Sequence, residues 1–244
     1  MRYSKVHQID ALLSSMTAVD LAPTLERGIP IYPTHPHLII DPTMSHKRDG
    51  YYCQSVLMAE HTGCHCDAPA HIIEGMRDQT IEKLPPTALI GPAKVYDFSC
   101  RDWQPGQLLT LRDIADYEEK LGEPIEEAEI ALINFGWLER YWSTDRGALF
   151  YASNQPGMDE QAVKFFRDRR VAAVGADTIA CEIAMIDGVA GPEFGHQQYW
   201  LPNNILILEC IANLHKLPRT CFLFAAPLPI KDGSGSPLRP IAYF

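Results

Sequence analysis

The chain has 244 residues, of which 46% are hydrophobic and 21% charged, a composition typical of a soluble globular protein with a substantial core. Its 21 Lys and Arg residues against 31 Asp and Glu residues give a net charge of −10. Because nucleic acid and anionic membranes repel a chain of this charge, we expect neither as a partner.

Cysteine usage and the N-terminal sequence indicate an intracellular protein. The seven cysteines are odd in number and show no framework spacing, which favours reduced thiols. The N-terminal stretch carries charges where a signal peptide needs an apolar segment, and no apolar run approaches the roughly 20 residues that span a bilayer. We therefore expect a cytoplasmic location.

Predicted strands and helices alternate along the chain. A short amphipathic helix is expected around residues 9–16, followed by extended backbone at 19–25 and in the proline-rich stretch 27–40. Residues 51–69 are rich enough in β-branched and aromatic side chains for one or two strands. Further strands are expected within 88–99, 129–137, 171–178, 204–214 and 221–230, and helices within 110–122 and 158–171.

This alternation predicts the α/β class, and the irregular N-terminal half favours a mixed sheet over a regular series of parallel units. No internal repeat, low-complexity segment or long linker divides the chain. We therefore expect residues 1–244 to form a single domain.

The greatest density of reactive side chains lies at residues 61–71, which read HTGCHCDAPAH. Side chains of a strand alternate, so His61, His65 and Asp67 share one face. Two imidazoles and one carboxylate form a ligand set suited to zinc, and also to manganese or iron. Because three protein ligands leave positions open for water and substrate, the pattern indicates a catalytic metal site.

The competing interpretation is a buried strand whose histidines are merely hydrogen-bonded. Two histidines and an acid on one face are costly to bury without a cation, so we favour the metal site. Four residues of extended strand span about 13 Å, so His61 and His65 can share a metal only if the backbone bends, and Gly63 permits the bend. Cys64 and Cys66 point to the opposite face and are expected to be small buried residues.

Pro69 turns the chain beyond this face, so His71 can return to the site beside the metal's water instead of on the metal. A histidine in that position is suited to act first as general base and then as general acid. A purely structural metal site has no use for such a residue, so His71 favours an enzyme over a non-catalytic metal-binding assembly protein.

Two other patterns carry no predicted chemistry. The glycine-rich segment DGSGSP at 232–237 follows no strand–helix pattern of a phosphate site, and we expect it to be a turn. A GxSxG nucleophile elbow is absent from the sequence.

The stretch 61–71 resembles the HxGTHxDxPxH signature of the cyclase family of metal-dependent hydrolases, which includes bacterial kynurenine formamidase and isatin hydrolase. This chain departs from the signature at Cys64, where the family usually has threonine. Further stretches are similar to family segments and follow in the same order: GIPIYPTHP at 28–36, QPGMDEQAVKFFRDRRVAAVGADT at 155–178 and NNILILECIANLHKLP at 203–218.

The resemblance implies a role for each matching residue. His61, His65 and Asp67 would be metal ligands, and His71 the proton-transfer residue. Glu209 matches an acid that contributes to the metal centre in formamidases. Tyr32 stands where an aromatic side chain lines the substrate pocket.

A second metal in the family uses a histidine about twelve positions before that glutamate. The ungapped match in this chain is Gln197, and the histidine is its neighbour His196. Either the segment contains a one-residue insertion or the site has lost a ligand. We therefore favour one zinc or manganese ion, with a second ion as the alternative.

The family also implies a mixed sheet partly closed into a barrel with peripheral helices, assembled as a dimer or tetramer. The implied reaction is hydrolysis of an amide-type C–N bond in a small aryl carbonyl compound, with N-formylkynurenine as the default substrate. A cyclic amide of the isatin type, or a lactone, is the alternative, because a single ion is favoured and because Glu182 in DTIACE replaces the family's aspartate.

Overall fold

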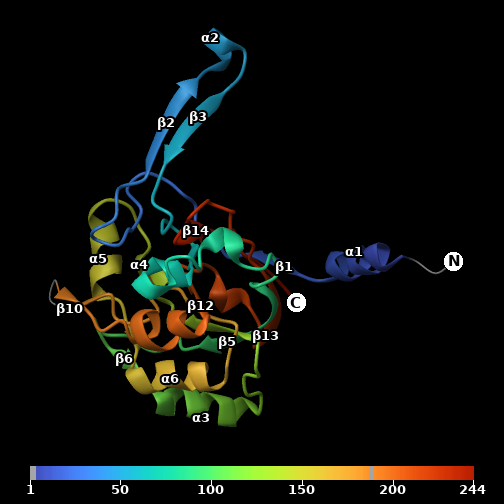
Figure 1. The fold of residues 1–244 in the computed structure, drawn as a ribbon, viewed down its shortest axis with the longest axis vertical. Coiled ribbons are helices and arrows are strands. Elements are labelled where there is room, and N and C mark those ends of the chain that lie inside the picture. The colour runs from blue at the N-terminus through green and yellow to red at the C-terminus, as the bar shows by residue number, and fades with distance from the viewer. Residues whose placement is uncertain (1–3, 187–188) are drawn as a thin grey trace.

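The fold, a computed structural model that describes residues 4–186 and 189–244, is organised around one nine-stranded sheet (Figure 1). Its strands are β1 (Ala18–Asp20), β4 (His65–Asp67), β5 (Ile90–Asp97), β7 (Ile130–Asn134), β9 (Ala173–Ala176), β12 (Leu206–Glu209), β13 (Thr220–Phe224), β14 (Gly235–Pro237) and β15 (Ile241–Tyr243). They lie in the order β1-β15-β13-β5-β7-β9-β12-β4-β14.

The sheet is mixed in direction. The neighbours β5, β7, β9 and β12 run parallel to one another, and the outer pairings are antiparallel. The sheet curls as a half-barrel with helices outside it, which confirms the fold class expected from the sequence.

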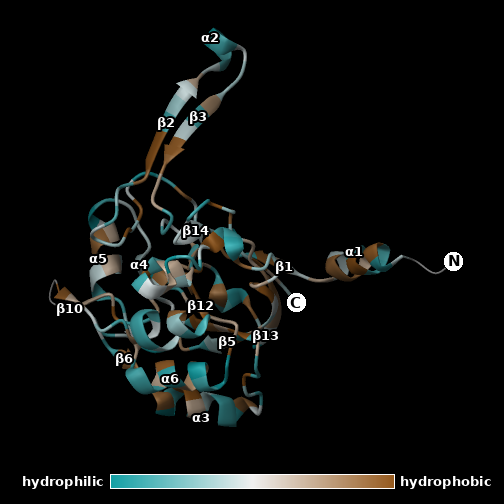
Figure 2. Cartoon of the chain, viewed as in Figure 1, coloured by the Kyte–Doolittle hydropathy of each residue, from teal (hydrophilic) through white to brown (hydrophobic). Residues whose placement is uncertain are grey.

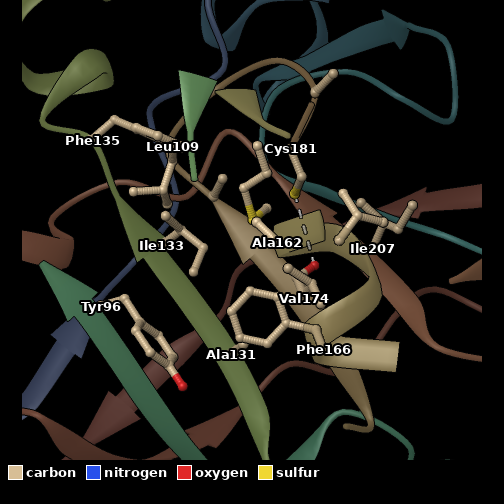
Figure 3. Close-up of a cluster of buried hydrophobic side chains, with 14 of the residues drawn as sticks. Tyr96, Leu109, Ala131, Ile133, Phe135, Ala162, Phe166, Val174, Cys181 and Ile207 are labelled. Atoms are coloured by element: carbon tan, nitrogen blue, oxygen red, sulfur yellow. Dashed lines mark hydrogen bonds between the residues drawn. The ribbon is translucent and has the colours of Figure 1, made fainter. Parts of the chain in front are cut away.

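Buried apolar side chains cover both faces of the sheet, as is typical of a sheet whose central strands run parallel. On β12, Ile207 packs into one core cluster, whereas Leu206 and Leu208 pack into the other. Figure 3 shows the first cluster, where the Phe166 ring from a covering helix lies near Tyr96 and Val174 of the sheet.

Two helices, α3 (Leu111–Leu121) and α6 (Glu160–Asp168), contact each other on one side of the molecule (Figure 1). Helix α3 begins with a capping box in which the Thr110 side chain accepts from the Asp113 N–H, and Asp113 accepts from the Thr110 N–H. It ends at Gly122, which adopts a left-handed φ of 67°. Both helices lie within the ranges predicted for them.

Further helices, short strands and turns complete the fold. They are α2 (His46–Asp49), α4 (Trp137–Tyr141), α5 (Arg146–Asn154), the short strands β6 (Leu108–Leu109), β8 (Gly157–Met158), β10 (Met185–Ile186) and β11 (Val189–Ala190), and the turns η1 (Pro69–His71), η2 (Glu74–Met76), η3 (Ile81–Lys83), η4 (Gly195–Tyr199), η5 (Leu201–Asn203) and η6 (Leu214–Lys216). Among the described residues, no helix has the length and apolarity needed to cross a membrane.

Two elements leave the body of the molecule, and we call them the arms (Figure 1). The first is helix α1 (Lys5–Ser15), which includes most of the predicted helix and contains no buried residue. The second is the hairpin of β2 (Ile39–Met44) and β3 (Cys53–Leu57), with every residue of β3 exposed. Figure 2 shows apolar stretches along both arms. Leu12 in α1 is 61% exposed, and Leu57 in β3 is 65% exposed.

Candidate active site

The first half of the histidine-rich stretch is not the continuous strand that the alternation predicted. Only His65–Asp67 forms β4, whereas residues 61–64 turn, because Gly63 adopts a left-handed φ of +65°. The ring centroids of His61 and His65 consequently lie 5.2 Å apart. A larger residue would be strained at this positive φ, and its β-carbon would also displace Leu25 Cδ2, 2.5 Å away, so the bend favours glycine there.

Strand β12 brings an acid to these histidines. It runs antiparallel to β4 with Glu209 opposite His65, and Glu209 Oε2 lies 3.1 Å from His65 Nε2. On the other face of β4, Cys66 packs with Cys64 in the second core cluster, where burial raises the pKa of both thiols. Both cysteines are buried, as expected from the alternation.

The turn η4 determines which side chain of its segment reaches the site. It is a π-type turn, which holds one more residue than an α-helical turn. As a result, His196 is buried beside Asp67 and Glu209, whereas Gln197 is exposed and donates to Glu193 at 3.3 Å. The structure therefore places His196 in the ligand cluster and corrects the assignment of Gln197 to it.

Two sets of ligand atoms lie close enough together to hold a metal ion. One set is His61, His65 and Asp67, and the other is Asp67, His196 and Glu209. Asp67 joins the two sets, with Oδ1 at 2.6 Å from His61 Nδ1 and Oδ2 at 3.3 Å from His196 Nε2. His196 thus lies in the second set, where the spacing in the sequence had suggested that a histidine was missing.

Burial and charge in the cluster fit a divalent cation. Glu209 Oε1 is buried and makes no well-aligned hydrogen bond among the described residues, with His196 Nε2 3.3 Å away. Imidazole and carboxylate ligands suit zinc and manganese. Burial alone would raise the pKa of Asp67, but the histidines around it hold that pKa well below its usual range. Burial would lower the pKa of His65, but Glu209 and Asp67 raise it to about 9. Such buried acids favour positive charge beside them, either as protons on histidine or as a metal ion.

Glu182, which the sequence marked only as a departure from the family, orients His196. It is fully buried, and its Oε2 lies 3.0 Å from His196 Nδ1. Its Oε1 accepts from the backbone N–H groups of Gly195 and His196. A carboxylate behind a ligating histidine fixes the ring orientation and leaves the other nitrogen for the metal. An acid within the apolar run 179–186 was the only sequence signal for this role.

His71 completes the site at the end of η1. Its ring centroid lies 3.9 Å from that of His61 and 6.4 Å from that of His196, and it is not part of either ligand set. Burial lowers the pKa of His71 to about 4, so the ring is neutral near pH 7 and can accept a proton.

A cavity of about 230 Å³ opens onto these side chains. Tyr32 lines it, as the resemblance implied, and donates to Glu193 at 3.4 Å. His35, which the sequence did not single out, lines the same cavity 5.6 Å from the His61 ring. The complete lining consists of Tyr32, Thr34, His35, His61, His65, His71, Ile72, Ile179, Ala180, Glu193, His196 and Glu209.

Known proteins resemble this chain in both sequence and fold. The sequence profile of the Cyclase family matches residues 19–183. Isatin hydrolase from Roseibium aggregatum is 31% identical over 195 residues, which cover 77% of this chain and 73% of that protein. A crystal structure of an isatin hydrolase bound to the product analogue thioisatinate aligns with a TM-score of 0.88 and 28% identity, covering 100% of this chain and 99% of the other. Isatin hydrolase A from Ralstonia solanacearum aligns with a TM-score of 0.82 and 27% identity, covering 100% and 98%.

Fold, site and relatives define a metal-dependent hydrolase. The chain belongs to the cyclase family, as its residues 61–71 predicted.

Proposed function

We propose that this enzyme hydrolyses an amide C–N bond in a small, uncharged aryl carbonyl compound, with a cyclic amide such as isatin as the first substrate to test. The observation that carries the proposal is the convergence of a neutral His71 and two metal-ligand sets on one cavity. The names of the isatin hydrolase relatives support the choice of substrate.

In the proposed reaction, the chain's own residues hold the ligand cluster and move protons. A divalent cation bound there would polarise the carbonyl oxygen and make hydroxide available near neutral pH. His71 takes the proton of the attacking water while the new C–O bond forms. The C–N bond then breaks, and His71 returns the proton to the departing nitrogen.

We propose zinc or manganese as the metal, with capacity for two ions. The first ion would be held by His61, His65 and Asp67. Two observations support a second ion: His196 faces both Asp67 and Glu209 at 3.3 Å, and Asp67 presents one oxygen to each ligand set. Carboxylates that span two sites in this way are typical of paired metal centres.

The cavity lining supports an uncharged substrate. Of the described residues that line it, none is Lys or Arg, and Glu193 adds a carboxyl group beside Tyr32. The amino-acid carboxylate of N-formylkynurenine would therefore lack a basic partner in this cavity. Isatin has no such group, so we rank the cyclic amide above the formamide.

The test is turnover of metal-reconstituted enzyme on isatin, N-formylkynurenine, an uncharged formanilide and a simple aryl lactone. We expect ring opening of isatin at a higher kcat/KM than for the other compounds, and loss of this activity after chelation. Equal or faster turnover of N-formylkynurenine would reverse our ranking. Inactivity of the metal-loaded enzyme on all four would contradict the proposed reaction and favour the non-catalytic assembly protein.

We further propose a homo-oligomer, with the arms as the contact between copies, and a reducing, cytoplasmic location. An isolated helix of about eleven residues and a lone two-stranded hairpin are marginally stable in water, so both arms need a surface to pack against. Their exposed apolar side chains, among them Leu12 and Leu57, support such a contact. The cytoplasmic proposal is supported by seven cysteines that are all free.

A further inference from the structure

The glycine-rich segment 232–237, expected from its sequence to be a simple turn, lies against the metal-ligand cluster. Its end forms β14, which pairs antiparallel with β4 so that Gly235 lies opposite Asp67. Backbone hydrogen bonds also fix the start of the segment, from Ala68 N–H to Ser234 O at 2.9 Å and from Ile81 N–H to Gly233 O at 2.9 Å.

Ser234 is the residue of this segment that contacts a ligand. Its Oγ lies 2.8 Å from His61 Nε2, while His61 Nδ1 lies 2.6 Å from Asp67 Oδ1. The adjacent Gly235 makes this approach possible. A β-carbon at that position would lie 2.5 Å from His61 Cε1 and 2.7 Å from the Cys66 carbonyl oxygen.

Glu60 determines the direction of the hydrogen bond between Ser234 and His61. The Ser234 hydroxyl donates to Glu60 Oε2 at 2.6 Å, and the Ser234 N–H donates to the same oxygen at 2.8 Å. Because a serine hydroxyl has one proton and that proton goes to Glu60, Ser234 Oγ can only accept from His61. His61 Nε2 must therefore carry a hydrogen, which leaves Nδ1 as the nitrogen that faces Asp67.

We propose that Ser234, held by Glu60, is a positioning residue of the metal centre that fixes the tautomer of His61 for metal binding through Nδ1. The inference rests on the metal part of the proposed function. The other two histidines have comparable partners, since His65 Nδ1 lies 2.8 Å from Gly63 O and His196 Nδ1 lies 3.0 Å from Glu182. Each of the three proposed ligand rings therefore has a partner for the nitrogen that faces away from the metal. For His61 that partner comes from the C-terminal segment.

The test measures zinc affinity by competition with a chromophoric chelator for wild type, Ser234→Ala, Glu60→Ala and Glu60→Gln. Loss of such an outer partner typically lowers metal affinity by about 10–100-fold, which we expect for Ser234→Ala. Glu60→Ala frees the hydroxyl to turn and should weaken binding to a similar extent. Glu60→Gln keeps an acceptor oxygen and should recover most of the affinity.

Ser236→Ala is the matched control. Ser236 lies two residues further on in the same segment, and its Oγ accepts from Leu228 N–H at 2.8 Å and donates to the Pro237 carbonyl. A loss of affinity common to both serine variants would indicate a general effect on the segment and overturn the proposal. Unchanged affinity in Ser234→Ala would overturn it as well.

A nitrogen-correlated proton spectrum of the zinc-loaded protein tests the tautomer directly. Wild type should show a protected Nε2–H on His61 with zinc on Nδ1, and this signal should lose its protection in Ser234→Ala. A wild-type spectrum with the proton on Nδ1 contradicts the proposal even if Ser234→Ala does not fold. Isatin turnover enters neither measurement, so the tautomer assignment and the proposed reaction can fail independently.

Discussion

Helices α1 and α3 each contain 11 residues, yet they relate to the rest of the molecule in opposite ways. Helix α3 begins with a capping box, buries Ile114 and Glu118, and packs with α6 outside the sheet. Helix α1 buries no residue and projects from the body, as the β2–β3 hairpin does (Figure 1). The same contrast separates the strands that carry the ligand cluster from both arms.

The difference indicates that the buried strands and the exposed arms have different roles. Strands β4 and β12, which carry the proposed ligands, are buried along their whole length and paired on both sides. Backbone held in this way can keep charged side chains in a fixed geometry. The apolar side chains of the arms are exposed to solvent in a single chain, which suits them to the proposed contact between copies. The following variants test this contrast, beginning with the largest expected effect.

Within the buried centre, His71→Ala and His61→Ala should separate catalysis from metal binding. His71→Ala is expected to keep the metal and lose about 10²–10⁴-fold in rate, the usual cost of removing a general acid–base. His61→Ala is expected to lose both, because His61 belongs to the first ligand set. Metal analysis beside steady-state kinetics provides the two measurements.

His215→Ala is the control, since His215 is an exposed histidine paired with Glu139 and should leave both quantities unchanged. If His71→Ala emptied the site of metal, His71 would be a ligand and the assigned roles would be wrong.

Glu182→Gln tests how far the fixed geometry depends on a buried carboxylate. The amide can donate toward His196 Nδ1 instead of accepting from it, so the second ligand set should bind metal about 10–100-fold more weakly. Calorimetric titration with zinc should show one of the two proposed binding steps weakened and the other unchanged. Glu118→Gln, which changes a buried acid bonded to Tyr96 and Ile125, should leave both steps intact. Equal losses in the two variants would argue against a specific role for Glu182.

The arms are tested by placing charge on the apolar face of α1. Ile9→Asp combined with Leu12→Asp should raise the dissociation constant of the oligomer at least tenfold, because both side chains are more than half exposed and apolar. Sedimentation velocity over a concentration series measures this, and metal content should not change. Ala11→Asp with Ser14→Asp adds the same charge to the opposite, exposed face of the helix and should dissociate the oligomer less. Equal effects of the two pairs would indicate charge repulsion instead of an apolar contact.

The smallest effect is expected at the start of α3, the anchored counterpart of α1. Burial would raise the pKa of Asp113, but hydrogen bonds from Arg101 and Thr110 outweigh it and lower the pKa to about 2. This group therefore adds stability above pH 3.8, and the stability is lost as the pH falls through about 2. Asp113→Asn should lower the free energy of unfolding by about 1 kcal/mol at pH 7, after allowance for partial exposure.

Urea unfolding of both proteins from pH 2 to 7 measures that difference. It should shrink toward zero at the acid end, and a constant difference across this range would exclude the charge as its source. Asp116→Asn, on an exposed face of the same helix, serves as the control.

The sequence predicted correctly those elements whose determining residues all lie within the element itself. The range 110–122 held a complete helix because its cap, its apolar face and its terminal Gly122 are all local. The arrangement of His65 and Asp67 on one face and Cys66 on the other followed from strand alternation. The strand does not continue through 61–64, because the left-handed conformation of Gly63 provides there the bend that was expected between His61 and His65.

The partners that surround the ligands could not be predicted in the same way. Glu182 and Ser234 are separated from the histidine-rich stretch by more than a hundred residues, and only the strand order brings them to it. Counting residues back from Glu209 also pointed to Gln197, because spacing alone does not reveal the wider turn at η4.

The wide turn at η4 and the acid beneath it act as one unit. His196 stands 13 residues before Glu209 (209 − 196), and Glu182 is one methylene longer than the aspartate of the pattern it resembles. One oxygen of Glu182 accepts from the N–H groups of Gly195 and His196, and the other lies 3.0 Å from His196 Nδ1. The same buried carboxylate thus holds the backbone of the turn and the imidazole that the turn carries. The length of a single side chain therefore sets how far His196 reaches toward Asp67 and Glu209.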